Sequence, residues 1–132
     1  MQQRKKSGCI YVLIISVSKD IRIIVGALGS INFGKGLYAY VGSAQRSPEK
    51  RIERHLKKAK RKFWHIDYLL DDNAVKILEV FSKEAERPSE CRIAREISVK
   101  GFSIKGFGSS DCKCASHLFK LSDYKFLERV YA

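Results

Sequence analysis

The sequence has no long hydrophobic run. Its longest apolar stretch, Cys9–Val17, is interrupted by Ser16 and is far shorter than the ~20 residues that a membrane-spanning helix needs. The basic residues before this stretch resemble the start of a signal peptide, but no small-x-small cleavage site follows. With 45% hydrophobic and 30% charged residues, the chain also differs from disordered proteins. We therefore expect a folded cytoplasmic protein that has no membrane partner.

Acidic residues are scarce, and the chain has neither an internal repeat nor a low-complexity linker. There are 14 Asp and Glu against 26 Lys and Arg, which gives a formal net charge of +12. A chain of 132 residues without a linker predicts one domain, which we place at residues 8–132 after a basic tail at residues 1–7. A domain of this size does not require disulfides, so we expect its cysteines to be reduced thiols.

The excess positive charge is concentrated between residues 46 and 62, where nine Lys or Arg accompany two Glu. Clustered cations of this kind neutralise phosphates, which makes nucleic acid the expected partner. The alternative is a solvated helix face rich in lysine. No base-reading motif is visible, so we expect contacts with the nucleic-acid backbone. The residues expected to make these contacts are Arg46, Lys50, Arg54, Lys57, Lys58, Lys60, Arg61 and Lys62.

The order of strand and helix patterns predicts one mixed α+β domain. The strands, marked by runs of β-branched and apolar residues, are expected at residues 8–17, 21–28, 37–41 and 75–81. The second of these is expected to pair with the first in antiparallel fashion. Residues 29–36 have the composition of a loop. The C-terminal segment, residues 116–131, starts like a strand and ends in a predicted helix.

The basic segment also carries helix signals. Ser47 is a predicted N-cap, and Pro48 suits the first helical position. Phe63 and Trp64 could stack on bases, but we expect them to anchor the core. Residues 64–70 fit a strand or a short helix, and a further helix is expected at about residues 90–97. The buried face of the basic helix is predicted from apolar residues at helical spacing, namely Ile52, Leu56, Ala59 and Phe63.

Tyr11 and Tyr40 lie in apolar strands close to glycines, where a tyrosine is usually part of the core. The segment after Tyr40 makes this pair of interest, because a short loop leads into a helix with Arg51 and His55. These two residues are four apart and therefore share one helix face, where they could hold a phosphate. The alternative is that both are ordinary exposed residues of a basic helix.

These residues resemble a known superfamily. Cys9-Ile10-Tyr11 and Tyr40-Val41-Gly42 are similar to the paired motifs of the GIY-YIG nuclease superfamily, and Arg51 with His55 matches its catalytic helix. The stretches LYAYVGSA, WHIDYLL, SEC and GFGSSDCKCASHLF resemble a narrower branch. That branch is largely archaeal, poorly characterised and sometimes fused to a DNA glycosylase of the endonuclease III type. The resemblance covers about residues 8–120.

The resemblance implies a small antiparallel sheet of three core strands and an extra hairpin, flanked by helices. It further implies hydrolysis of DNA phosphodiester bonds in repair or recombination. Tyr11 and Tyr40 would be the motif tyrosines, one of which orients or deprotonates the attacking water. Arg51 would stabilise charge on the pentavalent phosphate, and His55 would position water or phosphate. His65 would match a further catalytic histidine.

The resemblance also implies a glutamate that opens a later helix and binds Mg²⁺ or Mn²⁺, and Glu90 fits this position. Glu90 shares a helix face with Ala94 and Ile97, so its carboxylate points toward the apolar side of the helix. A carboxylate in that place needs a cation or hydrogen-bond donors. The alternative is an acid at a helix start that the dipole and backbone NH groups satisfy.

Three departures separate the chain from the superfamily pattern. Residues 21–36 set the two tyrosines further apart than in familiar members, which implies an extra hairpin or loop. The only asparagines, Asn32 and Asn73, precede Glu90, whereas many members have one after the glutamate. Cys9 occupies the position of the first motif glycine. DNA binding without catalysis is therefore an alternative.

A second candidate metal site lies near the C-terminus. Cys112, Cys114 and His117 offer soft ligands for Zn²⁺, and Cys91 or His65 could complete a tetrahedral site. The spacing differs from that of common zinc knuckles, so the alternative is an ordered turn with packed cysteines.

Two function classes follow from these residues. The first is a metal-dependent endonuclease that requires Glu90. The second is a non-catalytic nucleic-acid-binding module, with or without structural zinc, that is accessory to a repair enzyme such as a glycosylase-like protein. Both would bind DNA in a salt-sensitive way, so binding alone does not separate them. The sequence indicates no particular oligomeric state.

Overall fold

The computed structural model describes residues 8–44, 46–57, 61–85, 88–108, 114 and 116–130, with Val130 described by its backbone alone. The tail predicted at residues 1–7 lies outside these residues, as do Lys58, Lys60 and Cys112. The elements are β1 (Cys9–Val17), β2 (Ile21–Ile24), the 3₁₀ helix η1 (Gly26–Leu28), β3 (Ser30–Phe33), β4 (Gly36–Ala44), α1 (Pro48–Leu56), α2 (His65–Leu70), β5 (Val75–Glu84), α3 (Ser89–Ser98), β6 (Gly101–Ser103), β7 (Leu118–Leu121) and α4 (Phe126–Val130).

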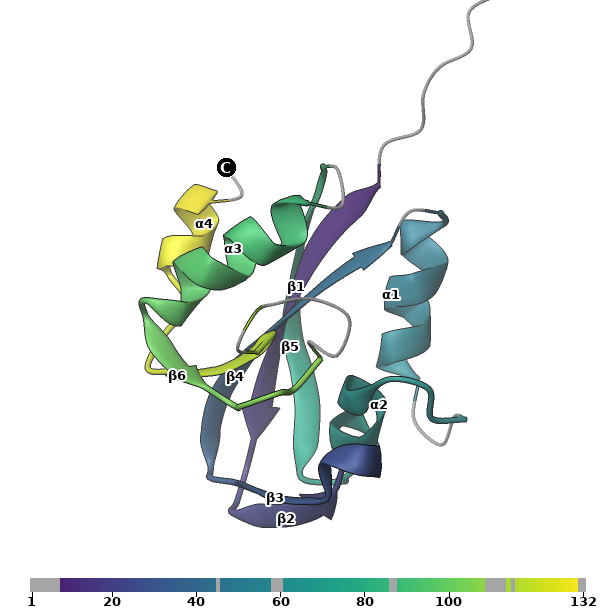
Figure 1. Cartoon of the computed structure of the whole chain (residues 1–132), viewed down its shortest axis with the longest axis vertical. Helices are drawn as coiled ribbons and strands as arrows, with labels where there is room; N and C mark the ends of the chain where they lie inside the picture. Colours follow the sequence, from purple (N-terminus) through teal and green to yellow (C-terminus); the bar gives the residue numbers. More distant parts are fainter. Residues whose placement is uncertain are drawn as a thin grey trace, which may run out of the picture.

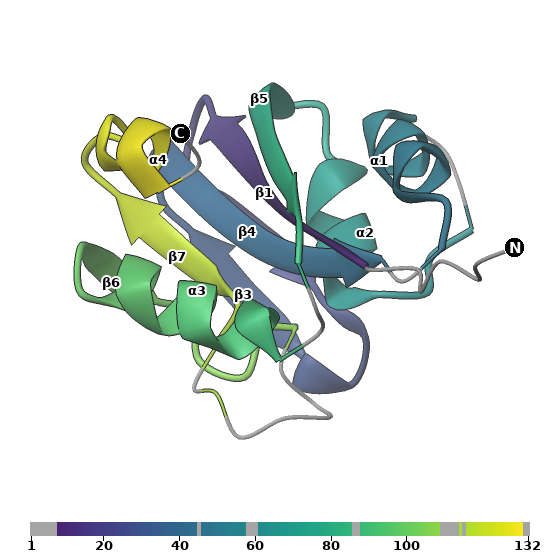
Figure 2. The same cartoon turned by 90° about the horizontal axis from the view of Figure 1, so that it is seen from above.

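β1 and β4 form the centre of a five-strand antiparallel sheet with the order β5-β1-β4-β7-β6 (Figures 1 and 2). Every residue of β1 except Ser16 is buried, as expected for an apolar strand that is covered on both faces. In the register of this pair, Tyr11 lies opposite Gly42 and Leu13 lies opposite Tyr40. Tyr11 and Tyr40 are therefore diagonal neighbours on one face of the sheet.

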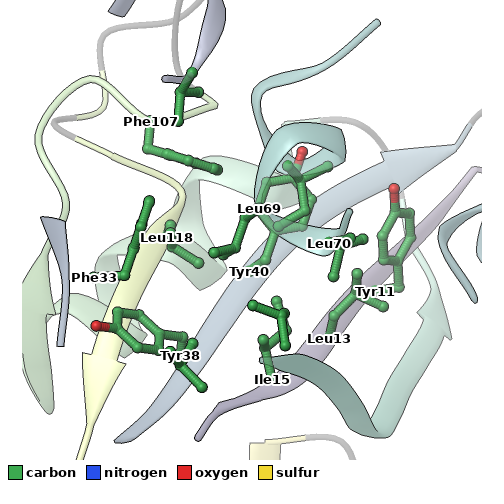
Figure 3. Close-up of a cluster of buried hydrophobic side chains, with 14 of the residues drawn as sticks. Tyr11, Leu13, Ile15, Phe33, Tyr38, Tyr40, Leu69, Leu70, Phe107 and Leu118 are labelled. Atoms are coloured by element: carbon green, nitrogen blue, oxygen red, sulfur yellow. The ribbon is translucent and has the colours of Figure 1, made fainter. Parts of the chain in front are cut away.

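Helices cover both faces of the sheet. Figure 2 shows α1 and α2 on one side and α3 and α4 on the other. Because side chains alternate along each strand, the sheet contributes to two separate cores. The core beneath α2 includes Tyr11, Leu13, Ile15, Tyr38, Tyr40, Ile66, Leu69, Phe107 and Leu118 (Figure 3). The core beneath α3 and α4 includes Ile10, Val12, Val41, Ile93, Ala94, Ile97, Phe119 and Leu127.

The α+β class and the antiparallel sheet flanked by helices are confirmed, but one predicted strand pairing is wrong. β2 pairs with β3 in a separate two-strand sheet, and not with β1. The reason is that β4 and β5, both long, already occupy the two edges of β1. The hairpin of β2 and β3 lies between the two motif tyrosines in sequence, and β3 falls within residues 29–36, which were predicted as a loop.

The predicted buried face of the basic helix is confirmed only for Ile52, which packs against the core, and Ala59 lies outside the described residues. The helix ends at Leu56, where Lys57 takes an extended conformation, so Phe63 is not part of it. Leu56 is 57% and Phe63 67% exposed, and neither anchors the core. His55 is buried instead, at 2% exposure, because its ring contacts the sheet. Ser47 does not act as a side-chain cap: its φ of 48° is left-handed, and its backbone carbonyl accepts bonds from the first turn.

Among the described residues, no helix combines the length and the apolar character that crossing a membrane requires. The cysteines in this part of the chain, Cys9, Cys91 and Cys114, form no disulfide with one another, and Cys112 lies outside it.

Candidate active site and metal-ligand cluster

Tyr11 of β1 meets His55 of α1 in the core beneath the helix. The Tyr11 hydroxyl lies 2.8 Å from Nε2 of His55, and both side chains are buried. Burial raises the pKa of Tyr11 to about 12, although the nearby Arg51 guanidinium acts to lower it. The phenol is therefore protonated at neutral pH. The Tyr11 hydroxyl is the donor in the tautomer of His55 whose proton lies on Nδ1, since Nε2 is then the acceptor.

Tyr40 of β4 lies beside this pair. Burial raises its pKa well above the ordinary value, and the charges of Tyr11 and Glu90 raise it further. The Tyr40 ring stands edge-on to His55, with 6.2 Å between ring centroids. Figure 3 shows the hydroxyls of Tyr11 and Tyr40 at the same end of the cluster, whereas the Tyr38 hydroxyl points elsewhere. The two motif tyrosines thus present their hydroxyls to one region.

Gly42 makes room for the Tyr11 ring, which crosses directly over it. A Cβ atom at position 42 would lie 2.5 Å from Cζ and 2.6 Å from the hydroxyl of Tyr11. Real Cβ atoms do not approach other atoms so closely, and the buried ring has no solvent into which it could move. The glycine of the Tyr40-Val41-Gly42 motif is therefore a packing requirement of the tyrosine on the neighbouring strand.

We expect Gly42→Ala to lower the free energy of unfolding by about 1–3 kcal/mol, the usual cost of an added methyl in a packed core. Urea denaturation of the variant measures this loss. The matched comparison places the same change in a Tyr11→Ala background, where no ring opposes the methyl. There we expect the penalty to disappear. An equal penalty in both backgrounds would show that the ring is not its cause.

Arg51 and Glu90 reach the same strand end from opposite faces of the sheet. Nη1 of Arg51 donates to the backbone carbonyl of Ser43, at 2.9 Å, and its guanidinium stacks on Trp64, 4.5 Å from the ring centroid. The Ser43 hydroxyl donates to Oε1 of Glu90, at 2.8 Å. Ser43 was not singled out in the sequence, although it directly follows the Tyr40-Val41-Gly42 motif.

Tyr11, Tyr40, Arg51 and Glu90 gather around the end of β4. Tyr40 belongs to this strand, the Tyr11 ring crosses Gly42, and Arg51 and Glu90 both bond to Ser43. The Glu90 side chain is 19% exposed, and its Oε2 lies 3.0 Å from Nδ1 of His117. Its two carboxylate oxygens thus have polar neighbours within the protein.

His65 lies on a different side of Tyr40. Its Nδ1 accepts a hydrogen bond from the backbone NH of Gly108, at 2.8 Å. Burial lowers the pKa of His65, which favours the neutral ring that this bond requires. Gly108 in turn packs against the Tyr40 ring, where a Cβ would lie 3.2 Å from Cε1. The contacts of His65 therefore hold the turn before residue 109 against Tyr40.

The basic residues predicted to bind DNA divide into two groups. Arg46, Lys50, Lys57 and Arg61 are exposed. Arg54, by contrast, forms a two-pronged ion pair with the fully buried Asp67, at 2.9 and 3.0 Å. Lys62 lies 3.3 Å from Asp71 on the surface.

Asp67 is the most buried charged group in the described part of the chain, with no exposed surface. Besides Arg54, it accepts the backbone NH groups of Phe63 and Trp64 at 2.8 and 3.0 Å. It thereby fixes the chain where it enters α2. An acidic residue within the apolar run WHIDYLL was the signal that could have identified it.

A group of metal-ligand side chains lies near Glu90. The ligand atoms of Cys91, Cys114 and His117 all fall within 4.8 Å of one another, close enough for a metal site. Of the predicted zinc ligands, Cys114 and His117 are therefore together. Cys91, which was considered as a further ligand, belongs to the group, and His65 does not.

We compared the chain with known proteins. A family model described as a domain of unknown function, DUF123, matches residues 10–132. Neither the curated proteins nor the solved structures gave a match. The matched range includes Tyr11, Tyr40, Arg51 and Glu90, together with all four helices. Because this match covers nearly the whole sequence, the chain belongs to the DUF123 family.

Proposed function

We propose that the protein is a divalent-metal-dependent endonuclease that hydrolyses DNA phosphodiester bonds, in the manner of the GIY-YIG nucleases that it resembles, in repair or recombination. The observation that carries this proposal is that Arg51 and Glu90 both bond to Ser43, which directly follows the Tyr40-Val41-Gly42 motif on which the Tyr11 ring packs. The two tyrosines, Arg51 and Glu90 come from β1, β4, α1 and α3, and they supply the groups that phosphodiester hydrolysis requires.

Tyr11 and His55 are suited to take the proton from the attacking water. The Tyr11 hydroxyl is protonated, so it cannot accept a proton without releasing its own, and Nε2 of His55 can take that proton in the tautomer with its own proton on Nδ1. The water gives its proton to the Tyr11 oxygen while Tyr11 passes its proton to Nε2 of His55. The hydroxide formed attacks phosphorus, and the bond to the leaving oxygen breaks. The leaving oxygen takes a proton from solvent, and His55, which ends as the imidazolium, returns its proton to solvent. This relay avoids a phenolate in a buried site.

Arg51 supplies positive charge where the phosphorane forms. Its stacking on Trp64 and its bond to the carbonyl of Ser43 hold the guanidinium beside the Tyr11 hydroxyl, whose pKa it influences. A fixed cation stabilises developing negative charge without the cost of reorienting in the transition state. Arg51 is therefore the proposed stabiliser of the transition state.

Glu90 is the proposed ligand of Mg²⁺ or Mn²⁺. Its carboxylate is partly exposed and has the hard oxygen donors that these ions prefer, and Mg²⁺ commonly takes one or two carboxylates and keeps several waters. A bound ion would act as a Lewis acid on a phosphoryl oxygen. The exposed cations Arg46, Lys50 and Lys57 would contact the DNA backbone on either side of the scissile bond.

The test is nicking of supercoiled plasmid and of branched DNA with Mg²⁺ or Mn²⁺. We expect the native protein to nick, chelation to stop the reaction, and Glu90→Gln to reduce nicking to the level without metal. Glutamine keeps an oxygen that accepts the Ser43 hydroxyl, so the change isolates the charge. Glu96→Gln on the exposed face of the same helix is the matched control and should retain full activity. Undiminished nicking by Glu90→Gln would refute the assignment of the metal ligand.

A second candidate is a DNA- or RNA-binding module without catalysis. It is favoured by the contacts of Glu90, since Ser43 and His117 supply the polar neighbours that a half-buried carboxylate needs without a cation. In this case no substrate would be nicked, while salt-sensitive binding to nucleic acid would persist. The native protein in the same assay, with binding measured at two salt concentrations, separates the two functions.

A further inference from the structure

Three metal-ligand side chains far apart in sequence meet beside α3. Cys91 belongs to the first turn of this helix, Cys114 lies between β6 and β7, and His117 directly precedes β7. Their ligand atoms lie within 4.8 Å of one another. We propose that Cys91, Cys114 and His117 bind one zinc ion, which fastens α3 to the sheet. This inference does not depend on the proposed nuclease activity.

The ligand types and their separations suit zinc. Two thiolates and an imidazole are the soft and borderline donors that Zn²⁺ selects over Mg²⁺ or Ca²⁺. With Zn–S of about 2.3 Å and Zn–N of about 2.0 Å, a tetrahedral ion separates two sulfurs by about 3.8 Å, and a sulfur from a nitrogen by about 3.5 Å. Since the ligand atoms lie within 4.8 Å of one another, they must draw together by about 1.3 Å at most. Side-chain rotation alone can supply such a change.

A carboxylate, that of Glu90, lies beside His117, as is usual for a zinc-binding histidine. Oε2 of Glu90 lies 3.0 Å from Nδ1 of His117, and both groups are largely buried. A carboxylate next to a metal-binding imidazole raises the basicity of the ring. Cys91 would thus bind the ion directly, and its neighbour Glu90 would act on the same ion through His117.

The cluster is accessible to an ion from solvent. Cys91 and Cys114 form part of the wall of a cleft of about 320 Å³, which Ser98, Ser103 and Ser116 also line. A metal site needs such an entry path, and the cleft can hold the water that fills a fourth coordination position. The half-buried thiols and the buried imidazole place the ion at the border between the cleft and the core.

Metal content and cobalt spectroscopy test the proposal on the full chain. We expect protein purified in reducing buffer to contain about one zinc per chain. Titration of the metal-free protein with Co²⁺ alone should give the intense visible absorption of a tetrahedral site and a thiolate-to-cobalt charge-transfer band. Cys91→Ser and Cys114→Ser should each weaken zinc binding at least tenfold, and Glu90→Gln should weaken it less than either.

Cys9→Ser is the matched control, because it removes a buried thiol outside the cluster. It should keep one zinc per chain. The proposal is overturned if the native protein gives no charge-transfer band with Co²⁺, if zinc remains in the Cys91→Ser, Cys114→Ser double variant, or if mass spectrometry finds a Cys91–Cys114 disulfide in place of metal. The cobalt titration uses the native protein, so it decides the matter even if a variant fails to fold.

Discussion

Tyr11→Phe is expected to lower the rate of DNA cleavage about 10²–10⁴-fold, the usual contribution of a positioned acid or base. The change removes one oxygen, which in our proposal receives the proton of the attacking water and passes its own proton to His55. The aromatic ring and its packing over Gly42 remain. Stability should therefore change only by the loss of one hydrogen bond, about 1 kcal/mol. Single-turnover nicking rates, together with urea denaturation, measure the two effects separately.

Tyr38→Phe is the matched control for this experiment. Tyr38 is also buried in the same core, and its hydroxyl donates one hydrogen bond, of 2.7 Å, to the carbonyl of Gly34. It belongs to the same strand as Tyr40, but its hydroxyl lies away from the site (Figure 3). Its removal should cost similar stability and no activity. Equal rate losses in the two variants would contradict a chemical role for Tyr11.

Asp67→Asn is expected to lower the free energy of unfolding by about 3 kcal/mol, because breaking a buried ion pair leaves its groups poorly compensated. Asp67 has no exposed surface. Its two carboxylate oxygens accept two hydrogen bonds from Arg54 and two from backbone NH groups, whereas asparagine has a single acceptor oxygen and cannot accept all four. For a chain of this length the loss corresponds to a melting temperature lower by about 10 °C. Calorimetry measures it directly.

Asp71→Asn provides the comparison on the surface. The pair of Lys62 and Asp71 is exposed on both sides, and such pairs contribute about 0–1 kcal/mol. We expect this variant to melt within a few degrees of the native protein. If both variants lost the same stability, the contribution of Asp67 would not come from its burial.

The effect of Asp67 should depend on pH. Burial acts to raise its pKa, but the bonds from Arg54, Trp64 and Phe63 outweigh burial and hold the pKa below the unfolded value of 3.8. A carboxyl group with a lowered folded pKa contributes its full stability above the unfolded pKa and loses it as pH falls through the folded pKa. The difference between native protein and Asp67→Asn should therefore be constant near neutral pH and shrink below about pH 4.

The sequence pattern predicted the long elements better than their pairing. β1, β4, β5 and α3 appear where apolar and periodic runs indicated them, because those runs match buried faces. The pairing of β2 could not be read from its composition, since it depends on which longer strands occupy the edges of β1. In α1, Ile52 packs against the core as expected, but the buried residue of the next turn is His55 and not Leu56, because the sheet below provides a hydroxyl for a polar ring.

The residues of the candidate site also divide into those that the sequence could identify and those that it could not. Tyr11, Tyr40, Arg51 and Glu90 could be proposed from motifs, because each motif fixes a residue type at a known place relative to a strand or helix. The roles of Ser43 and Asp67 depend on partners that folding alone brings near. The contact between Glu90 and His117 is of the same kind, since it joins the start of a helix to the start of a strand.

Ser43 joins two helices that never share a face of the sheet. Its carbonyl holds Arg51 of α1, and its hydroxyl holds Glu90 of α3, so one residue at a strand end connects both sides of the molecule. Any force that shifts α3, such as the gain or loss of a metal at Cys91, would reach Arg51 through this residue after only two hydrogen bonds. A change in the redox state or metal supply of the cell would then shift α3 and, through Ser43, the position of Arg51.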